Sequence, residues 1–556
     1  MTAADRGPPA RSWGPFEPLR ERAFRRIWSA SLLSNFGQLI LGVGAAWEMT
    51  RLTTSAEMVA LVQSALMLPL MLVSVPGGAI ADMFDRRKIA MAGLGFATLS
   101  AATLTALSWA GLASPWVLLA FCALIGAGVA LYGPSWQASI SEQVRPEHLP
   151  AAIALGSISY NIARSFGPAL GGMIVLAAGT TAAFGINAVC YLPLLVAFFL
   201  WRREHVPGRL PPERMHRAIV SGARYVMHSP PIRTVLVRSF VFGLVSASVA
   251  ALTPLVARDL LHGDANTYGL LLGASGVGAV LGALLIGQVR ERLKGEHAVR
   301  LSVIVAGLMV LAIGLSHSLL LTGVLLLAAG AANMLLISLF NVAVQLSAPR
   351  WVTARALSLF NASLTGGIAL GAWLWGRAAS EWGVDGALIA SGVALILTML
   401  VGFVLPMPAV SLAEVEMVDI GHEPEVALAI TARSGPIVIE IDYRVDPAEA
   451  RRFYDVMLQL QRVRLRNGGF EWSISRDIAN PALWTERYHL PTWGDYLRLR
   501  SRSTQADQDL QARADAFHAG DAGVRVRRRL ERPFGSVRWR AETPDPDQGG
   551  IRVNAP

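Results

Sequence analysis

The sequence predicts an all-α membrane protein with twelve transmembrane helices in two pseudo-symmetric six-helix bundles, followed by a cytoplasmic α+β domain. Two observations support this fold class. The 556 residues are 53% hydrophobic and only 16% charged, with a mean hydropathy of +0.45, whereas soluble domains carry about 25% charged residues. Apolar runs of about 20 residues, the length that spans a bilayer, recur along the chain and stop before Pro406.

Twelve apolar runs can be delimited along the chain. They cover residues 27–47, 58–80, 89–109, 115–139, 152–177, 181–200, 235–256, 267–289, 299–316, 319–346, 357–379 and 386–405. The preceding segment 1–22 is polar and basic and has no small-residue cleavage site. The first run is therefore expected to be a retained helix and not a signal peptide.

The longest loop between the runs, residues 204–232, divides them into two sets of six. One bundle is expected over 23–203 and the other over 233–406. When the sequence is aligned with itself at a shift of 203 positions, Pro146 falls on Pro349, and each proline lies at the entry to the fifth helix of its half. Transporters built from such parallel halves bind substrate between them and work by rocking of the halves. The loop itself is expected to contain a basic amphipathic helix on the membrane surface.

Arginine and lysine residues concentrate in the loops on one side of the predicted bundles. They precede the first helix or follow the second, fourth, sixth, eighth and tenth helices. Because Lys and Arg accumulate in the short loops that stay in the cytoplasm, both termini are expected to be cytoplasmic. The same asymmetry accounts for the net charge of +10 without a nucleic-acid partner.

After Pro406 the character of the sequence changes. A mixed linker at 407–434 precedes alternating, strand-like sequence at 435–535, and 536–556 is expected to be a disordered tail. The predicted order is strand 436–445, helix 447–466, strand 470–477, strand 483–490, helix 492–518 and strand 523–531. This β-α-β-β-α-β order is of ferredoxin-like type, and about 100 residues suffice for an independent domain.

The loop after the second run has the sequence PGGAIADMFDRRK at 76–88. Glycines let helices approach closely, and a carboxylate at a helix end accepts bonds from a neighbouring N-terminus or a guanidinium. Exposed charge pairs contribute only about 0–1 kcal/mol, so they can break during a transport cycle. A conformational latch is therefore expected from Gly78, Asp82, Asp85, Arg86, Arg87 and Lys88, although the three cations also serve as topology signals.

This loop resembles the signature loop of the major facilitator superfamily, and GPALGG is similar to the helix-5 motif of antiporters in that superfamily. SNFG at 34–37, YGPSWQA at 132–138 and PRWVTARALSLF at 349–360 resemble the enterobactin-exporter-like, or transmembrane secretion effector, group. The resemblance covers nearly the whole chain. It implies the major facilitator fold and export of a siderophore, drug or secondary metabolite across the bacterial cytoplasmic membrane by proton antiport. Uptake by symport on the same fold is the alternative. The residues of the helix-5 motif GPALGG, at 167–172, are Gly167, Pro168, Gly171 and Gly172.

Arg164 is a charged residue inside the apolar run 152–177. A charge at the bilayer centre costs about 2.5–3.5 kcal/mol on insertion scales, so such residues face the bundle interior or a water-filled cavity. We expect Arg164 to bind an anionic group of the cargo or to set the proton affinity of a nearby carboxylate. The structural alternative is an arginine bonded to backbone carbonyls and to Asn161.

Proton coupling requires a carboxylate that titrates in a cavity, and Glu48 is the main candidate. The alternative role for Glu48 is an ion pair with Arg51 at the membrane interface. Several polar or aromatic side chains within the runs are expected to line the cargo cavity, with interhelical hydrogen bonding as the alternative for each. They are Asn35 and Gln38 on one face of the first helix, Tyr132 and Trp136 on the fourth, and Asn161, Asn333, Asn341 and Asn361.

The sequence contains no G-x-x-x-x-G-K-[ST] loop, metal-ligand spacing or nucleophile–base pair, so no cofactor, metal or enzymatic activity is expected. The C-terminal order resembles the dimeric α/β barrels of antibiotic-biosynthesis monooxygenases, with Trp472, Trp493, His489 and His518 as candidate pocket residues. Because fold similarity does not establish chemistry, a dimerisation or regulatory module is favoured over an oxygenase. The expected partners are thus a small-molecule cargo, protons, the lipid bilayer and, through this domain, a second copy of the chain.

Overall fold

The computed structural model describes residues 16–83, 85–145, 148–201, 215–293, 295–349, 352–408, 418, 424, 426–428, 430–520 and 523–531. Most of the predicted N-terminal segment, the loop 202–214 and the tail 536–556 therefore lie outside the described residues. The chain divides into two compact units. Unit 1 comprises Met1–Met215, Leu236–Asn341 and Ser358–Met407, and unit 2 comprises His216–Val235, Val342–Leu357 and Pro408–Pro556.

The first half of the chain is helical. It contains η1 (Glu17–Arg20), α1 (Arg22–Leu52), α2 (Ala56–Met83), α3 (Arg86–Trp109), α4 (Pro115–Ser139), η2 (Ile140–Glu142) and α5 (Leu149–Leu200). Several of these helices begin at side-chain caps that satisfy free backbone N–H groups. Asp85 accepts a hydrogen bond from the Arg87 amide at the start of α3, and Ser114 accepts one from the Val117 amide at the start of α4.

The second half continues the helical pattern. It contains α6 (Met215–Met227), α7 (Pro230–Leu255), the π-helical turn η4 (Val256–Leu260), α8 (Ala265–Arg292), α9 (Gly295–Gly314), α10 (Leu319–Ser347), α11 (Thr353–Leu397), η5 (Thr398–Leu400) and α12 (Val401–Val404). Asp264 and Thr267 form a reciprocal capping box at the start of α8. Within the described residues, nine helices are long and apolar enough to cross a membrane, as a multi-pass membrane protein requires.

Two of the long helices contain a break at a glycine. Gly179 in α5 has φ 80° and ψ 172°, and Gly383 in α11 has φ 79° and ψ 165°. Glycine adopts such positive φ values without the steric cost that a Cβ atom brings. Both breaks lie in gaps between the predicted apolar runs. Their separation is also close to the 203-residue shift that relates the two halves.

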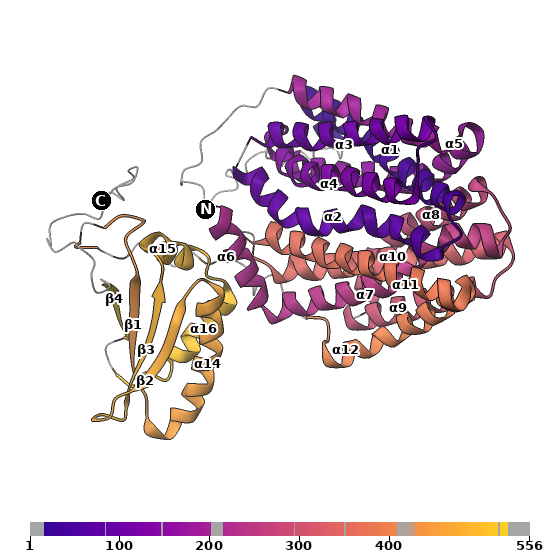
Figure 1. Ribbon diagram of the computed structural model, residues 1–556. Helices are drawn as coiled ribbons and strands as arrows, with labels where there is room; N and C mark the ends of the chain where they lie inside the picture. Colours follow the sequence, from indigo (N-terminus) through magenta and orange to yellow (C-terminus); the bar gives the residue numbers. More distant parts are fainter. Residues whose placement is uncertain are drawn as a thin grey trace, which may run out of the picture. The chain divides into compact units, whose positions relative to one another are not determined.

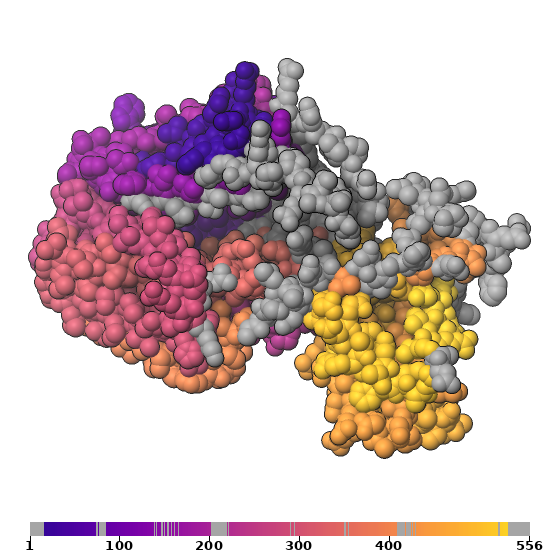
Figure 2. Space-filling view, turned by 180° about the vertical axis from the view of Figure 1, so that it is seen from behind, coloured from indigo at the N-terminus to yellow at the C-terminus, as the bar shows by residue number. Residues whose placement is uncertain are grey.

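Within unit 1, the helices of the first half, in indigo and purple, lie beside those of the second half, in pink and orange (Figure 1). The space-filling view shows the same two groups adjoining each other (Figure 2). Leu41, Leu94 and Phe184 are among the fully buried side chains of the core. Large apolar side chains such as Trp109 and Leu284 are exposed, as expected for helices that face lipid.

The C-terminal domain in unit 2 contains four strands and three longer helices. They are β1 (Ile437–Arg444), η6 (Pro447–Glu449), α14 (Ala450–Arg466), β2 (Phe470–Arg476), β3 (Leu483–Leu490), α15 (Trp493–Ser501), α16 (Gln505–Asp515) and β4 (Arg525–Leu530). The antiparallel sheet has the order β2-β3-β1-β4. The predicted single helix 492–518 is wrong, because Thr504 and Asp507 form a capping box that starts a second helix.

The two faces of this sheet differ in character. In β1, alternate residues Ile439, Ile441 and Tyr443 are buried against helical residues such as Phe453, as the period of a strand requires. The intervening residues face the other side, where Asp442 is paired with Arg527 at 2.6 Å. The sheet thus has one apolar face covered by α14, α15 and α16 and one charged face.

Candidate functional site

The two halves of unit 1 make a close backbone contact between α5 and α8. A Cβ atom added at Gly172 would lie 2.7 Å from the Cα of Gly269 and 2.8 Å from the carbonyl oxygen of Ala265. The reciprocal Cβ at Gly269 would lie 2.7 Å from the Cα of Gly172. Only residues without a side chain allow such an approach, so this glycine pair marks one place where the halves touch.

The other glycines of the helix-5 motif pack against α1. A Cβ at Gly167 would lie 3.0 Å from the Cβ of Leu39, and one at Gly171 would lie 3.1 Å from the Cβ of Val43. Pro168 is buried within the same helix, where proline removes a backbone donor. The sequence prediction of a smooth packing face is thereby confirmed, and that face serves two neighbouring helices.

Polar contacts join the halves near the α1–α2 and α7–α8 loops. Arg258 donates to the carbonyl oxygen of Thr50 at 3.0 Å and pairs with Asp259. The Trp373 indole donates to Glu57 at 3.1 Å, and the Ser64 hydroxyl donates to the carbonyl oxygen of Ala369 at 2.7 Å. We call this region, defined by Thr50, Glu57, Arg258 and Trp373, the closed end.

Arg164 lies on α5 away from the closed end. Its side chain is half-buried and makes no hydrogen bond or ion pair among the residues that the structure describes. Helical spacing places Arg164 on the side of α5 that carries Pro168 and Gly171. That side is directed toward the junction of α1 with α8, where the two halves meet. Among the described residues, Arg164 is thus a cation without a counterion, beside the interface between the halves.

Glu48 is buried near the closed end. One of its carboxylate oxygens lies 3.3 Å from the Arg51 guanidinium and accepts a bond of 2.6 Å from the Thr180 hydroxyl. The pair with Arg51 is the one that the alternative interpretation of the sequence expected. Thr180 directly follows the break at Gly179, so the carboxylate ties α1 to the part of α5 that begins at that break.

The predicted polar cavity residues lie in different surroundings. The Asn35 amide donates to the Ser159 hydroxyl at 3.3 Å and so links α1 with α5. The side-chain oxygen of Asn333 is buried without a hydrogen-bond partner among the described residues. Gln38 and Asn341 are half-buried, and Asn361 is exposed. The Asn161 side chain lies outside the described residues.

Tyr132 and Trp136 pack around one buried aromatic ring. Each makes an edge-to-face contact with Phe198, with ring centroids 6.2 Å apart in both cases. Trp201 contacts the same ring at 6.1 Å. Such edge-to-face geometry is favourable for aromatic pairs. The two residues therefore contribute to the interior packing of the first half, and a role in cargo binding stays a prediction.

The described members of the predicted latch make contacts within the first half. Asp85 caps α3, and Arg86 pairs with Glu142 at 2.8 Å. Arg87 donates to the carbonyl oxygen of Phe199, and Lys88 is exposed. The surroundings of Gly78 and the side chain of Asp82 lie outside the described residues. In this conformation, Arg86 and Arg87 thus bind residues of their own half.

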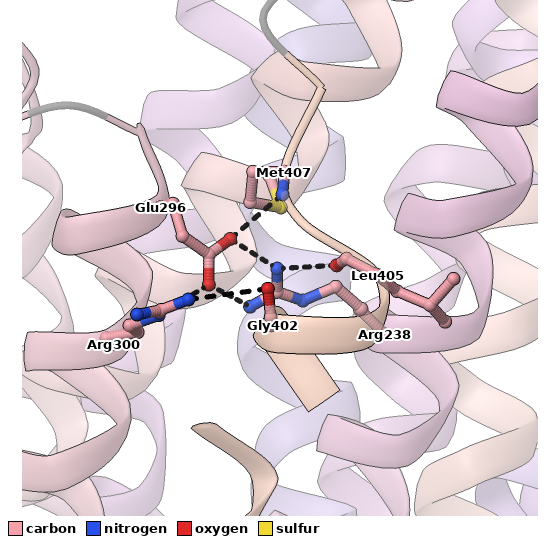
Figure 3. Close-up of polar contacts among 6 residues, drawn as sticks. All are labelled: Arg238, Glu296, Arg300, Gly402, Leu405 and Met407. Atoms are coloured by element: carbon pink, nitrogen blue, oxygen red, sulfur yellow. Dashed lines mark hydrogen bonds and ion pairs between the residues drawn. The ribbon is translucent and has the colours of Figure 1, made fainter. Parts of the chain in front are cut away.

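A buried ion cluster in the second half was not anticipated from the sequence (Figure 3). Arg238 on α7 has a side chain that is only 4% exposed and pairs with Glu296 on α9 at 2.6 Å. Glu296 also pairs with Arg300 at 2.9 Å and accepts a bond from the Met407 amide. Arg238 further donates to the carbonyl oxygen of Leu405. The feature of the sequence that could have indicated this cluster is Arg238, a charged residue within the apolar run 235–256.

The cluster fixes the end of the transmembrane part of the chain. Gly402 and Leu405 provide carbonyl oxygens to its two arginines, and the Arg300 guanidinium lies 4.2 Å from the ring centroid of Phe403. Figure 3 draws the hydrogen bonds from Arg238 on α7 to the Leu405 carbonyl oxygen and from Arg300 on α9 to the Gly402 carbonyl oxygen, both in the segment that leads out of unit 1. The position where the linker begins is therefore held by charge-assisted hydrogen bonds.

In the C-terminal domain, the four candidate pocket residues lie in different places. His518 lines a cavity on the helical side of the sheet. Trp472 donates to the buried Glu486 at 2.9 Å, and the ring of Trp493 packs against Tyr496. His489 lies between Glu471 and Glu531. Within the described residues, no group of three His, Cys, Asp or Glu side chains is placed to hold a metal ion.

Comparisons with known proteins cover almost the entire chain. A family model described as transmembrane secretion effector matches residues 13–534. The staphyloferrin A transporter of Staphylococcus aureus is 24% identical, over 52% of this chain and 72% of that protein. The enterobactin exporter EntS of Citrobacter koseri is 26% identical, over 67% of this chain and 89% of that protein. The solved structure of the nucleoside transporter NupG superposes with a TM-score of 0.57 at 11% identity and covers 69% of this chain and 100% of that one.

Proposed function

Because the chain belongs to the transmembrane secretion effector family of the major facilitator superfamily, we propose that it exports a small organic anion across the bacterial cytoplasmic membrane by alternating access. Relatives named as a siderophore exporter and a siderophore transporter favour a siderophore or a similar metabolite as cargo. Both termini are placed in the cytoplasm because Lys and Arg gather in the corresponding loops. Twelve spanning helices follow if α5 and α11 are each counted as two at their glycine breaks and α1 is included.

The observation that carries this proposal is the environment of Arg164. A half-buried guanidinium without a counterion is costly inside a membrane protein unless water or an anion compensates it. Arg164 lies beside the interface between the halves, beyond the glycine contact of α5 with α8. An anionic group of the cargo would neutralise Arg164 from this interface. Rocking of the halves about the α5–α8 contact would then expose the bound cargo to each side in turn.

Transport by inverted membrane vesicles tests the direction and the coupling. Vesicles with an acidic interior are expected to accumulate radiolabelled enterobactin or staphyloferrin A when they contain this protein. Accumulation should collapse when a protonophore removes the pH gradient. Accumulation only in right-side-out vesicles would establish the uptake symporter instead, and accumulation that survives the protonophore would eliminate proton coupling.

Arg164 itself is tested by substitution. Arg164→Ala is expected to raise the KM for anionic cargo at least tenfold, because a charge-assisted hydrogen bond is lost, whereas Arg164→Lys should retain part of the affinity. Arg292 is an exposed arginine at the end of α8, so Arg292→Ala is the matched control and should leave KM unchanged. Equal KM values for the three variants and the wild type would refute the role of Arg164.

We assign proton coupling to Glu48, which is buried at the closed end beside the break in α5. Protonation of this carboxylate weakens its ion pair with Arg51 while the Thr180 hydroxyl can still donate to it. Glu48→Gln is expected to retain binding of cargo but to abolish its pH-driven accumulation. Full pH-driven accumulation by Glu48→Gln would exclude Glu48 from the coupling step.

The latch, in turn, is assigned to the opposite conformation of the transport cycle. Arg86 and Arg87 now bind residues of their own half, and exchange of these partners for residues of the second half would hold that side shut.

The C-terminal domain is assigned to the ferredoxin-like class, because its strand order β2-β3-β1-β4 is the one that a β-α-β-β-α-β chain produces. We assign this domain a dimerisation or regulatory function in preference to a catalytic one.

A further inference from the structure

A cavity of about 510 Å³ lies in the C-terminal domain between the sheet and the helices α15 and α16. Ile439, Ile441 and Val526 provide an apolar floor from β1 and β4, whereas Tyr496 and Gln511 provide polar groups from the helices. Small-molecule sites commonly have volumes of about 300–1,000 Å³ and combine an apolar lining with a few polar groups. The cavity therefore has the size and lining of a site for a small organic ligand.

One cation at the cavity has no anionic partner among the residues that the structure describes. The Arg528 side chain donates a hydrogen bond of 2.7 Å to the Tyr496 hydroxyl, and its guanidinium forms no ion pair with those residues. By contrast, the neighbouring Arg464 is neutralised by the buried Glu486 at 3.0 Å. The uncompensated charge of Arg528 favours a ligand with an anionic group, because guanidinium groups bind carboxylates through charge-assisted hydrogen bonds.

The wall of the cavity is connected to the helix that joins the two transmembrane halves. Asp507 lines the cavity and pairs with Arg466 at the end of α14. The Arg466 guanidinium lies 5.1 Å from the ring centroid of Tyr225 on α6, and the Tyr225 side chain is buried. Asn467, the next residue, also lines the cavity. One short segment at the end of α14 thus contacts both the ligand site and α6.

Helix α6 contacts the start of α11 within the same unit. A Cβ atom added at Gly222 would lie 2.6 Å from the Cδ and 3.1 Å from the Cβ of Arg355. Arg355 belongs to the first turn of α11. A displacement of α6 would therefore be felt by a transmembrane helix of the second half, because packed elements shift between discrete arrangements and do not deform freely.

We propose that this cavity is a regulatory site for a small organic anion with an apolar body, and that its occupancy acts on α6 through Asp507 and Arg466. The anionic group would bind Arg528, and the apolar body would cover Ile439 and Ile441. Every residue that lines the cavity belongs to the C-terminal domain. Binding in the cavity and its effect on α6 can therefore be measured whether or not the proposed transport function holds.

The binding test uses the purified full chain in detergent micelles. A panel of aromatic carboxylates, with salicylate as its first member, is titrated by calorimetry beside the matched neutral amides. We expect at least one carboxylate to bind, the amides to bind at least tenfold more weakly, and Arg528→Gln to weaken carboxylate binding by a similar factor. Leu499→Trp, which fills the cavity, should abolish binding.

The matched control for this test is Arg529→Gln. Arg529 is the next residue of the same strand, but its guanidinium pairs with Glu440 on the opposite face of the sheet at 3.1 Å. Its replacement should leave carboxylate binding unchanged. Absence of binding by every carboxylate of the panel, or equal binding by the wild type and Arg528→Gln, would overturn the assigned ligand class.

The coupling to α6 is tested by hydrogen exchange of residues 220–228 with and without the bound carboxylate. Binding is expected to change the exchange rate of this segment in the wild-type protein. Arg466→Gln should retain binding, because Arg466 does not line the cavity, but should lose the ligand-dependent change. Exchange rates that do not respond to a bound carboxylate in the wild type would refute the regulatory connection, even if the cavity binds it.

Discussion

Replacement of Gly172 by alanine tests the proposal that the two halves pivot on the α5–α8 contact. The added Cβ would lie 2.7 Å from the Cα of Gly269 and 2.8 Å from the carbonyl oxygen of Ala265, both backbone atoms. Neither atom can move by a change of rotamer, so the helices must separate by about 1 Å. Overpacking of this kind costs about 1–3 kcal/mol. If only the conformation with the closed end carries this cost, its population falls about 5–150-fold relative to the opposite conformation.

The population shift can be measured by electron–electron resonance between spin labels. Thr54 and Trp382 are exposed and lie near the closed end in different halves, and labels there report its opening. Gly172→Ala is expected to shift the distance distribution to longer values and to lower the transport rate. Gly42→Ala is the matched control, because a Cβ at Gly42 meets no atom within 4 Å. A Gly172→Ala protein with wild-type distances and rate would refute the pivot.

Three further predictions concern ion clusters and one titrating group. Glu296→Ala leaves the buried Arg238 without its carboxylate and should destabilise the protein by about 3–5 kcal/mol in thermal unfolding, whereas Glu381→Ala removes an exposed pair and should cost about 0–1 kcal/mol. Glu486→Gln should likewise lower the unfolding temperature of the C-terminal domain far more than Glu531→Gln, because Glu486 is buried with Arg464 and Glu531 is exposed, and equal shifts would contradict this. Burial raises the pKa of Asp515, opposed by the Gln511 hydrogen bond. The stability contributed by its protonated form is present below the ordinary aspartate pKa and is lost as the pH rises through the raised pKa, so Asp515→Asn should flatten the pH dependence of domain unfolding in this range, and an unchanged profile would contradict the assignment.

The helical spans were predictable because their signal is local. A lipid-spanning helix needs a long apolar run, and the gaps between the predicted runs fell at Gly179 and Gly383, where the structure breaks α5 and α11. The packing role of Gly167 and Gly171 was predictable for a similar reason, because adjacent small residues give a helix a smooth face. The division of 492–518 into two helices was missed, although Thr504 and Asp507 carry the sequence signature of a capping box.

Contacts between distant residues were not predictable from spacing. Arg238 and Glu296 lie on different helices, and only the packing of α7 against α9 brings their charges together. Tyr132 and Trp136 share one helical face, as predicted, but which ring they contact depends on where Phe198 lies in space. The cavity in the C-terminal domain is assembled from strands and helices far apart in sequence, so no local pattern identifies it.

The most direct test of alternating access is to lock the closed end. Glu57 and Ser380, the two positions chosen for cysteine substitution, belong to different halves. In the native chain the Glu57 backbone amide donates to the Ser380 hydroxyl at 3.2 Å. The native Cys122 is buried and both native cysteines are free. A short thiol cross-linker applied to the Glu57→Cys, Ser380→Cys protein is expected to stop transport, and cleavage of the link by a reductant should restore it. A quantitatively cross-linked protein that still transports its cargo at the uncross-linked rate would contradict the rocking of the two halves.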